Sequence, residues 1–509
     1  MNKATPEVAV IRMYAAREEI YPREIKGRYA SWRWACVWMT QLMFYGLPWA
    51  QWNGRQAVLF DLGARKFYLL GIVLWPQDFI FLAVLLIICA FSLFLFTAVA
   101  GRLWCGFACP QTVYTEIFMW IERKIEGTRS ARMRLDRQPW SIAKFARKTA
   151  KHAAWGAVAL WTGFTFVGYF TPIGQLASEI VAMALGPWEL FWVLFYAFAT
   201  YGNAGWMREQ VCKYMCPYAR FQSAMLDADT LIVTYDKKRG EPRGVPAKAI
   251  SMKASLSAGI AATATSTATA TATATATNPA TAAASAGAGA GSGTSPETGL
   301  GDCIDCTMCV QVCPTGIDIR NGLQYDCIGC AACIDACNLV MDKVERPRGL
   351  IRYATDNGIR DALSVREIRK RTLRPRILVY IVLLVAICSA FFGTLLTRTP
   401  LKVDVIRDRG AMGREVDDGA IENVYRLQIM NTDERPHRYR ISVTGIDSIA
   451  LATPDEIAID GTVSRGVPVQ VRVAHGKARP GSNPIAFDVK AIDDPALQVH
   501  EKAVFLAPR

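Results

Sequence analysis

The cysteines are the residues of this sequence whose spacing could do chemistry, and 12 of the 15 fall in tight motifs. Eight of them form two runs of the pattern C-x2-C-x2-C-x3-C, "CIDCTMCVQVCP" and "CIGCAACIDACN". In bacterial ferredoxins the first three thiolates of such a run face one iron–sulfur cube and the fourth ligates the other cube. The spacing therefore predicts two 4Fe-4S clusters, the first held by Cys303, Cys306, Cys309 and Cys337 and the second by Cys327, Cys330, Cys333 and Cys313.

Paired zinc sites are the alternative for these eight cysteines. Zinc prefers four thiolates arranged as two C-x2-C pairs, which an unbroken quartet, repeated once, fits poorly. The second run departs from the usual pattern because Asn338 stands where proline normally follows the last cysteine. Since proline supplies no ligand atom, the departure concerns the local turn and leaves the ligand set unchanged.

Two further motifs share the form Cys-x-x-x-Cys-Pro, "WCGFACPQ" at Trp104–Gln111 and "VCKYMCPY" at Val211–Tyr218. On a helix, positions i and i+4 share one face, and the proline limits continuation of that helix. Soft thiolates favour copper(I), zinc or iron–sulfur. We therefore predict that the two pairs converge as a four-sulfur metal or redox site, with ordinary packing cysteines as the alternative. Its residues are Cys105, Cys109, Cys212 and Cys216.

The elements that carry these motifs are predicted to be membrane helices. The chain is 52% hydrophobic, contains 14 Trp and has a mean hydropathy of +0.17, as in an integral membrane protein with sizeable soluble parts. A bilayer span needs about 20 apolar residues. We therefore expect an α-helical bundle of about five transmembrane helices, with spans at Trp32–Trp52, Phe79–Ala100, Ala153–Thr171, Trp188–Trp206 and Ile377–Leu396.

Lysine and arginine predict the orientation of these spans. Met1–Ala30 holds six of them, Gly101–His152 holds 11 and Pro172–Pro187 holds none. By the positive-inside rule the N-terminus and the region Met207–Arg376 are cytoplasmic, and the tail after the fifth span is periplasmic. The formal net charge of +14 is thus explained by basic loops, and no nucleic-acid partner is expected. The first 28 residues lack an apolar core, so they do not read as a cleavable signal peptide.

Composition divides the rest of the chain. The alternating Ala/Thr and Ala/Gly tract between Ala254 and Gly299 predicts a disordered or extended linker. Beyond Thr397, short alternating segments separated by Gly, Pro, Asn and Asp predict a small antiparallel sandwich. The expected organisation is an N-terminal segment (1–30), a membrane domain with both Cys-x-x-x-Cys-Pro motifs (31–236), a low-complexity linker (237–299), an α+β bis-cluster ferredoxin domain (300–345), a connector (346–376), a fifth transmembrane helix (377–397) and an Ig-like β-sandwich (398–509).

In this combination the chain resembles the cytochrome c oxidase accessory protein family known as CcoG, FixG or RdxA. The resemblance implies a bacterial inner-membrane protein that assembles cbb-type cytochrome oxidase and reduces copper(II) to copper(I). It implies copper ions, oxidase assembly factors and a cytoplasmic electron donor as partners. Carried over to this chain, it makes the two thiol pairs the candidates for binding or reducing copper, as catalytic and metal residues.

Two other functions remain open at this point. A quinol-oxidising membrane ferredoxin resembling the NapH family shares the hairpins and the clusters, although the long sandwich tail favours the accessory-protein reading. A non-enzymatic copper assembly scaffold is the other, and the eight cluster cysteines speak against it because a scaffold needs no electron carrier. No G-x-G-x-x-G with a following acidic residue is seen, so electrons are expected to arrive from another carrier.

Overall fold

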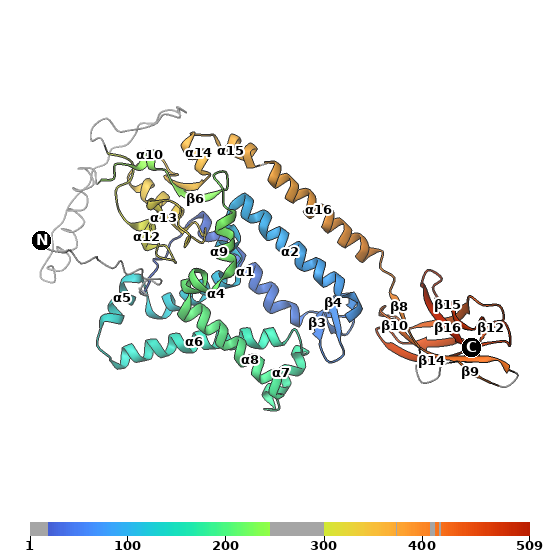
Figure 1. Cartoon of the computed structure of the whole chain (residues 1–509). Coiled ribbons are helices and arrows are strands. Elements are labelled where there is room, and N and C mark those ends of the chain that lie inside the picture. Colours follow the sequence, from blue (N-terminus) through green and yellow to red (C-terminus); the bar gives the residue numbers. More distant parts are fainter. Residues whose placement is uncertain (1–18, 245–299, 373, 408–412, 417–418, 509) are drawn as a thin grey trace, which may run out of the picture. The chain divides into compact units, whose positions relative to one another are not determined.

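The structure is a computed structural model that describes residues 19–244, 300–372, 374–407, 413–416 and 419–508 (Figure 1). The chain forms two compact units, each assembled from three separate stretches. Unit 1 comprises Met1–Gln41, Phe91–Thr162 and Leu194–Ile381, and unit 2 comprises Leu42–Ala90, Gly163–Val193 and Val382–Arg509. The predicted linker tract lies outside the described residues. All 12 motif cysteines fall in unit 1.

Both Cys-Pro motifs in unit 1 end one short helical segment and begin another. Pro110 and Pro217 are the first residues of α4 and α9, a position that proline favours because its fixed φ suits a helix and its missing N–H is not needed there. The helical elements of this part of unit 1 are α3 (Leu103–Phe107), α4 (Pro110–Glu126), α5 (Arg129–Arg137), most of α6 (Ile142–Val167), the π-helices η3 (Tyr201–Met207) and η4 (Val211–Met215), and α9 (Pro217–Met225).

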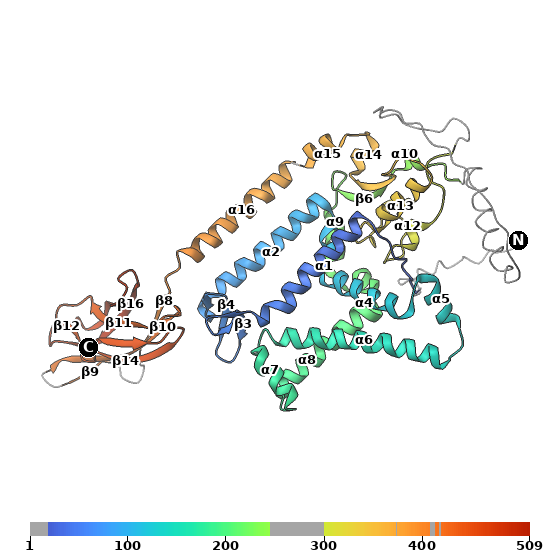
Figure 2. The ribbon, with the colours of Figure 1, turned by 180° about the vertical axis from the view of Figure 1, so that it is seen from behind.

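The ferredoxin region is closed by two strands that lie far apart in the sequence. β6 (Ile232–Tyr235) pairs antiparallel with β7 (Ile351–Ala354), and their side chains pack with α13 (Ala332–Lys343) in one buried cluster. The strands therefore join the ferredoxin core although they lie outside 300–345. Figure 2 shows this region from behind. The smaller elements are α10 (Lys237–Gly240), α12 (Met308–Gln311), η5 (Ile319–Asn321), α14 (Asp356–Arg360) and α15 (Val365–Thr372).

Two helices among the described residues are long and apolar enough to cross a membrane. They are Pro76–Ala100, which includes α2 (Phe79–Ala100), and α16 (Pro375–Leu396). The other three predicted spans fall on α1 (Arg28–Gly46), α6 and α8 (Pro187–Thr200). Helix α1 is only moderately apolar, the first half of α6 is basic, and α8 has 14 residues before the π-helix. The five-helix bundle thus stays a prediction.

Unit 2 contains a small sheet that the apolar pattern did not predict. β3 (Val58–Asp61), β4 (Lys66–Leu69) and β5 (Ile72–Leu74) form consecutive antiparallel pairs. The apolar stretch Leu69–Trp75, which is too short to span a bilayer, supplies the edge strand β5 of this sheet. Nearby are the two-residue strands β1 (Gln51–Trp52) and β2 (Arg55–Gln56), and α7 (Ile173–Val181).

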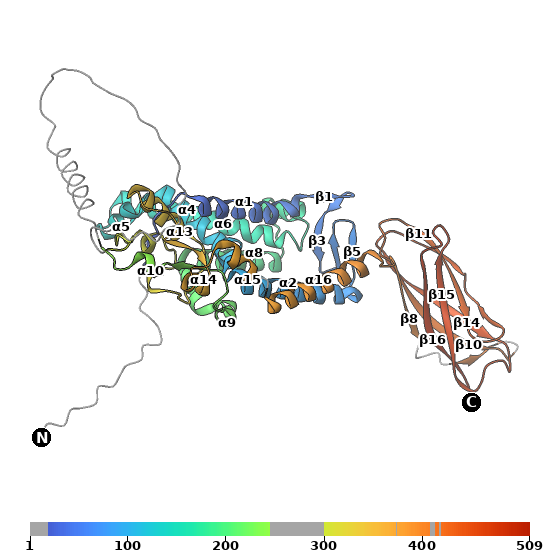
Figure 3. The same cartoon turned by 90° about the horizontal axis from the view of Figure 1, so that it is seen from above.

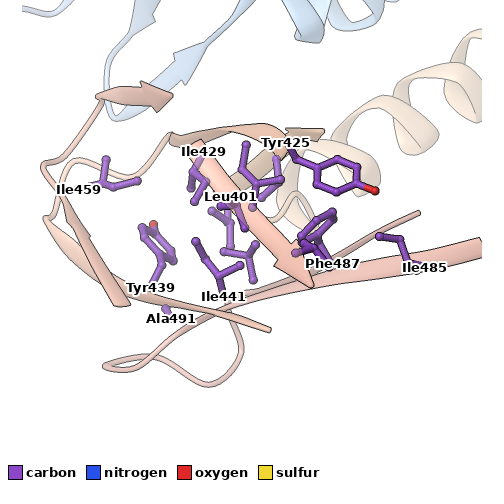
Figure 4. Close-up of a cluster of buried hydrophobic side chains, with 14 of the residues drawn as sticks. Leu401, Tyr425, Ile429, Tyr439, Ile441, Ile459, Ile485, Phe487 and Ala491 are labelled. Carbon is purple, nitrogen blue, oxygen red and sulfur yellow. The ribbon is translucent and has the colours of Figure 1, made fainter. Parts of the chain in front are cut away.

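The C-terminal part of unit 2 is a β-sandwich, which confirms the predicted Ig-like fold. One sheet has the strand order β12-β14-β10-β8 with β9 beside β10, and the other has the order β13-β11-β15-β16 (Figure 3). Tyr425, Ile429, Ile441 and Phe487 are buried between the sheets (Figure 4). The strands are β8 (Leu401–Arg407), β9 (Arg414–Glu415), β10 (Ile421–Asn431), β11 (His437–Thr444), β12 (Ile449–Leu451), β13 (Glu456–Ile459), β14 (Ser464–Val473), β15 (Gly481–Ala491) and β16 (Gln498–Ala507).

Candidate iron–sulfur and thiol sites

The four cysteines predicted to hold the first cluster line one cavity. This cavity is bounded by Cys303, Cys306, Cys309 and Cys337 together with Arg320 and surrounding, mostly apolar side chains. Cys337 reaches it from α13, whereas the other three come from the loop and short helix of the first run. The fourth cysteine of the second run thus shares a cavity with the first run. We call this cavity one.

The four cysteines predicted for the second cluster line another cavity, here called cavity two. Cys327, Cys330 and Cys333 come from the second run and Cys313 comes from the first. Cys309 lines both cavities, so the two lie next to each other. Folding therefore brings together the two sets of four cysteines that the spacing predicts.

The backbone around both cavities suits a negatively charged cluster. Asp305 and Thr307 in the first run, and Gly329 and Ala331 in the second, all have φ between 52° and 70°. These four occupy matching places in the two runs. Alternation of right- and left-handed residues turns successive N–H groups toward a common point, an arrangement found at many iron–sulfur sites. Non-glycine residues adopt this conformation at a cost, and such strain gathers at functional sites.

Single-ion sites are a different matter. Within the described ranges, no group of three or more His, Cys, Asp or Glu side chains is spaced to hold one metal ion. A four-iron cluster places each cysteine on a different iron, so its thiols stand further apart than those around one ion. For the Cys-x-x-x-Cys-Pro thiols, the finding means that at most two of the four are positioned to bind the same ion in this arrangement.

The two cavities differ in their access to solvent. Cys306, at cavity one, is exposed, while Cys303, Cys309 and Cys337 are buried. At cavity two, Cys330 is buried and the remaining three cysteines are partly buried. Cavity one therefore has an edge open to a partner from solution, at Cys306.

The thiol pairs do not lie on single helical faces, contrary to the expectation from their spacing. Cys105 lies in α3, but Cys109 has an extended backbone and stands just before α4. Cys212 lies in the π-helix η4, and Cys216 is extended just before α9. The following proline is the reason, because it disfavours helical backbone in the residue before it. Each pair thus spans a break between two helices.

The first thiol of each pair packs beside cavity two. Cys105 and Cys212 both contact a buried cluster that contains Cys330 and its neighbours Ile328 and Ala332. Cys105 also donates to the Gln222 side chain, with 3.5 Å between Sγ and Oε1. Segments more than 100 residues apart in the sequence therefore meet where a cluster ligand is buried.

Electrostatics indicate that the four thiols share one neighbourhood. Burial, together with the other three thiols of the set, raises the pKa of Cys105 to about 12 against the opposing effect of the Arg102 guanidinium. Burial, with Cys109 and Cys216, likewise raises the pKa of Cys212 to about 11. At neutral pH Cys105 and Cys212 are therefore protonated, so binding a metal requires them to release protons.

Gln111 connects the two motifs, and its role was not anticipated from the sequence. Its side-chain amide donates to the carbonyl oxygens of Asn203, at 2.8 Å, and Arg208, at 3.1 Å. Arg208, in turn, donates to the buried carboxylate of Glu122, which follows the first motif on α4. A glutamine directly after Cys-Pro was visible in the sequence as "CPQ". Its carbonyl partners lie some 90 residues away along the chain, so motif spacing could not identify them.

Comparison with known proteins agrees with this arrangement. A family model described as a 4Fe-4S dicluster domain matches residues 207–266 and 284–356, and one described as a 4Fe-4S binding domain matches 82–128. The Ig-like fold at the C-terminus of FixG matches 391–508. With eight cysteines around two adjacent cavities, these matches define the class: an iron–sulfur electron-transfer protein.

The particular family follows from full-length relatives. Nitrogen fixation protein FixG of Rhizobium meliloti is 36% identical, covering 100% of this chain and 96% of that protein. Protein RdxB of Cereibacter sphaeroides is 34% identical, covering 98% of each. A crystal structure of a FixG-related protein from Vibrio parahaemolyticus aligns with 21% of this chain and 96% of its own, at 19% identity and a TM-score of 0.20. The chain belongs to the FixG/RdxA family.

Proposed function

We propose that this protein reduces copper(II) to copper(I) and supplies the product for assembly of a cbb-type cytochrome oxidase. The observation that carries the proposal is the packing of Cys105 and Cys212 against the buried surroundings of Cys330. A soft thiol site that favours copper(I) thereby lies beside the residues assigned to an electron-carrying cluster.

The cluster ligands are proposed as the spacing predicts. Cys303, Cys306, Cys309 and Cys337 hold the first 4Fe-4S cluster in cavity one. Cys313, Cys327, Cys330 and Cys333 hold the second in cavity two. When bound, such clusters store and pass single electrons.

The chain's own residues bring substrate and electron source together. Each copper(II) takes up one electron and becomes copper(I), which the thiols retain because sulfur ligands favour the reduced ion. A low-potential one-electron carrier of the cytoplasm, a small reduced iron–sulfur or flavin protein, supplies that electron. The exposed edge at Cys306 is the proposed point of its arrival.

Copper reaches the thiols through an open cleft. The cleft is lined by Cys212 together with Arg102, Lys213, Arg220, Tyr325 and Asp326. Three of these side chains are cationic and one is anionic. Such a lining disfavours hydrated copper(II) and favours copper carried in a small anionic complex.

We place the protein in the bacterial inner membrane, with the ferredoxin region in the cytoplasm and the β-sandwich in the periplasm. Two candidate membrane helices and the distribution of Lys and Arg support this. The sandwich is then the part of the chain available to oxidase assembly factors on the periplasmic side.

A specific observation favours a second candidate. The 4Fe-4S binding-domain match at 82–128 contains Cys105 and Cys109, and the dicluster match begins at residue 207, ahead of Cys212 and Cys216. The four thiols would then ligate a third cluster, and the protein would act as a quinol-oxidising ferredoxin resembling the NapH family. A non-enzymatic copper scaffold is the third alternative, and it leaves the two cysteine-lined cavities without a role.

One anaerobic experiment separates these functions. The purified protein is assayed for iron, reduced chemically, freed of excess reductant and mixed with copper(II) or with a water-soluble quinone. The proposal expects about eight irons per chain and rapid formation of copper(I). About twelve irons, with quinone as the preferred acceptor, would establish the NapH-like function, and iron without any transfer to copper would leave the scaffold.

A further inference from the structure

Arg102 is a buried cation held almost entirely by backbone carbonyls. It is 8% exposed and stands between the end of α2 and Cys105. One guanidinium nitrogen donates to the carbonyl oxygens of Tyr325 and of Cys327, the latter at 3.2 Å, and the other donates to that of Ala219 at 2.6 Å. The side chain therefore ties the ligand loop of cavity two to the helix that follows the second thiol motif.

No carboxylate neutralises this cation within the described part of the chain. Asp326 lines the same cleft, but it pairs with Lys213 at 3.3 Å. Burying a charge without a counter-charge is costly unless something else compensates it. The compensation available here is the negative charge of cluster-bound thiolates, since Arg102 shares one cavity with Cys327, a proposed ligand of the second cluster.

Cavity one has a comparable arginine whose charge is already neutralised. Arg320 is 7% exposed and lines cavity one. It forms ion pairs with two carboxylates, Asp318 at 2.7 Å and Asp305. The two cavities are therefore matched in having a buried guanidinium, and they differ in whether acidic side chains cancel it.

A second guanidinium strengthens the contrast. Arg33 is also 8% exposed and lies with a nitrogen 3.5 Å from the carbonyl oxygen of Cys330. The carboxylates of Glu116 and Asp335 act on it electrostatically. Cavity two thus has a guanidinium beside the carbonyl oxygens of two of its cysteines, Cys327 and Cys330. The acidic group nearest to Arg102 in the cleft, Asp326, pairs with Lys213 instead.

We infer that Arg102 raises the reduction potential of the second cluster above that of the first. An added electron makes a cluster more negative, and a nearby buried cation stabilises that state more than it stabilises the oxidised one. Arg102 acts through the ligand loop and its field, as a tuning residue rather than a catalytic one. Electrons that enter at the exposed edge of cavity one then collect at cavity two, beside the thiols.

This direction of flow rests on the proposed function, but the order of potentials does not. The potentials are measured without copper, by an anaerobic redox titration of the full-length protein in detergent, with the two reduced clusters followed by their paramagnetic signals. If the protein does not reduce copper(II), the measured order of the two midpoint potentials still stands. If Arg102 does not set that order, the proposed reduction of copper(II) still stands.

The test compares Arg102→Gln with Arg102→Lys. The glutamine variant removes the charge and should shift one midpoint potential, the higher one, to a lower value while the other stays in place. The lysine variant keeps the charge and should retain most of the wild-type potential. Arg348→Gln is the control, since Arg348 lies in the same region, pairs with Asp342 and has 69% of its side chain exposed, where solvent screens its charge. It should change neither potential.

A further variant covers the case in which Arg102→Gln fails to bind iron. Leu323→Glu places a carboxylate in the cavity that Arg102 shares with Cys327 and removes none of the arginine's hydrogen bonds. It should lower the same potential as Arg102→Gln. Unchanged midpoint potentials in an iron-replete Arg102→Gln or Leu323→Glu protein would overturn the inference. An equal fall of the higher midpoint potential in Arg102→Lys and Arg102→Gln would overturn it too.

Discussion

Gly106 and Gly329 lie in backbone contact, so the first thiol motif rests directly on the ligand loop of cavity two. A β-carbon added to Gly106 would stand 2.7 Å from the carbonyl oxygen of Gly329 and 2.9 Å from the α-carbon of Cys330. Gly329 itself has φ +70, and a β-carbon there would stand 3.1 Å from the carbonyl oxygen of Arg102. Glycine at both positions lets the two segments approach this closely.

The first prediction concerns this contact. Gly106→Ala should push the thiol motif away from the ligand loop, because close-packed backbone cannot absorb a methyl group at 2.7 Å without moving. Since electron transfer slows steeply with distance, copper(II) reduction should fall several-fold while iron content stays at the wild-type value. Single-turnover mixing of reduced protein with copper(II) measures the rate.

Gly156→Ala is the matched control for Gly106→Ala. Gly156 lies in α6, and a β-carbon there would meet nothing within 4 Å. Alanine is favoured over glycine inside a helix, so this variant should be at least as stable as the wild type and equally fast. Equal rates in both variants would show that the contact does not limit electron transfer.

The second prediction separates the thiols from the clusters. Cys105→Ser with Cys109→Ser should abolish copper(I) production almost as fully as replacing all four thiols, because groups that act as a unit are non-additive. The iron content should stay near eight, since cavities one and two have their own cysteines. A loss of about one third of the iron from a twelve-iron protein would make these thiols cluster ligands instead.

Cys309→Ser should do the reverse. Cys309 lines both cavities, so its replacement should remove much of the iron. Copper(I) binding to the four Cys-x-x-x-Cys-Pro thiols should be retained. Iron is measured by metal analysis and copper(I) by titration against a coloured chelator. Unchanged iron in Cys309→Ser would contradict the assigned ligand set.

A third prediction follows from the charge of the cleft beside Cys212. Copper(II) as an anionic nitrilotriacetate complex should be reduced several-fold faster than copper(II) as a cationic ethylenediamine complex, and added salt should narrow the difference. Lys213→Gln should slow only the anionic complex. The same dependence on complex charge in wild type and Lys213→Gln would argue against entry through this cleft.

The fourth prediction concerns topology. A reporter that is active only in the cytoplasm should be active when fused after Gly240 or Arg360. A reporter that is active only in the periplasm should be active when fused after Gly481. The reason is the excess of Lys and Arg in the regions predicted to stay inside. A cytoplasmic signal at Gly481 would mean an even number of spans, with Trp32–Trp52 the first to be removed.

The fifth prediction is a pH dependence in the β-sandwich. Burial disfavours a charged His437 ring, but the carboxylates of Asp493, at 2.8 Å, and Asp433, at 3.3 Å, outweigh it and raise the pKa of His437. A raised folded-state pKa stabilises the domain fully below the unfolded value of about 6.5, and the stabilisation is lost as pH rises through the folded-state pKa.

Replacing His437 should therefore lower the unfolding free energy of the β-sandwich more at pH 5.5 than at pH 8.5. In His437→Gln the loss of unfolding free energy should be roughly 1 kcal/mol larger at the lower pH, the net contribution of a typical intramolecular hydrogen bond. Urea unfolding of residues 391–509, whose core is formed by its own side chains, measures it. His500→Gln is the control, since His500 pairs with Asp488 at the surface. Equal losses of unfolding free energy at both pH values would show that folding does not raise the pKa of His437, and would contradict the prediction.

The cluster chemistry could be predicted from the sequence because its information is local. Two C-x2-C-x2-C-x3-C runs within 35 residues, Cys303 to Cys337, specify both the ligand count and the crossing of the fourth cysteine. The sandwich was predictable for a similar reason, since alternation along a strand such as Ser464–Val473 reports directly which face is buried.

Helix breaks were predicted less well. The three other apolar stretches predicted as spans fall on helices that are partly basic, short or only moderately apolar, so they remain predictions. The i, i+4 spacing of Cys105 and Cys109 suggested one helical face, but proline at position 110 forces the preceding residue into an extended conformation.

The sequence by itself determined that eight cysteines fall into two runs whose spacing suits 4Fe-4S clusters, because spacing along a short loop limits the geometry that the thiols can form. Only the tertiary structure decided that Cys105 and Cys212 lie beside cavity two, that Arg102 joins Cys327 to Ala219, and that β6 pairs with β7. These contacts join segments some 100 residues or more apart. These contacts form because whole helices and strands pack together. The spacing of residues along the chain does not indicate which distant segment will pack against which.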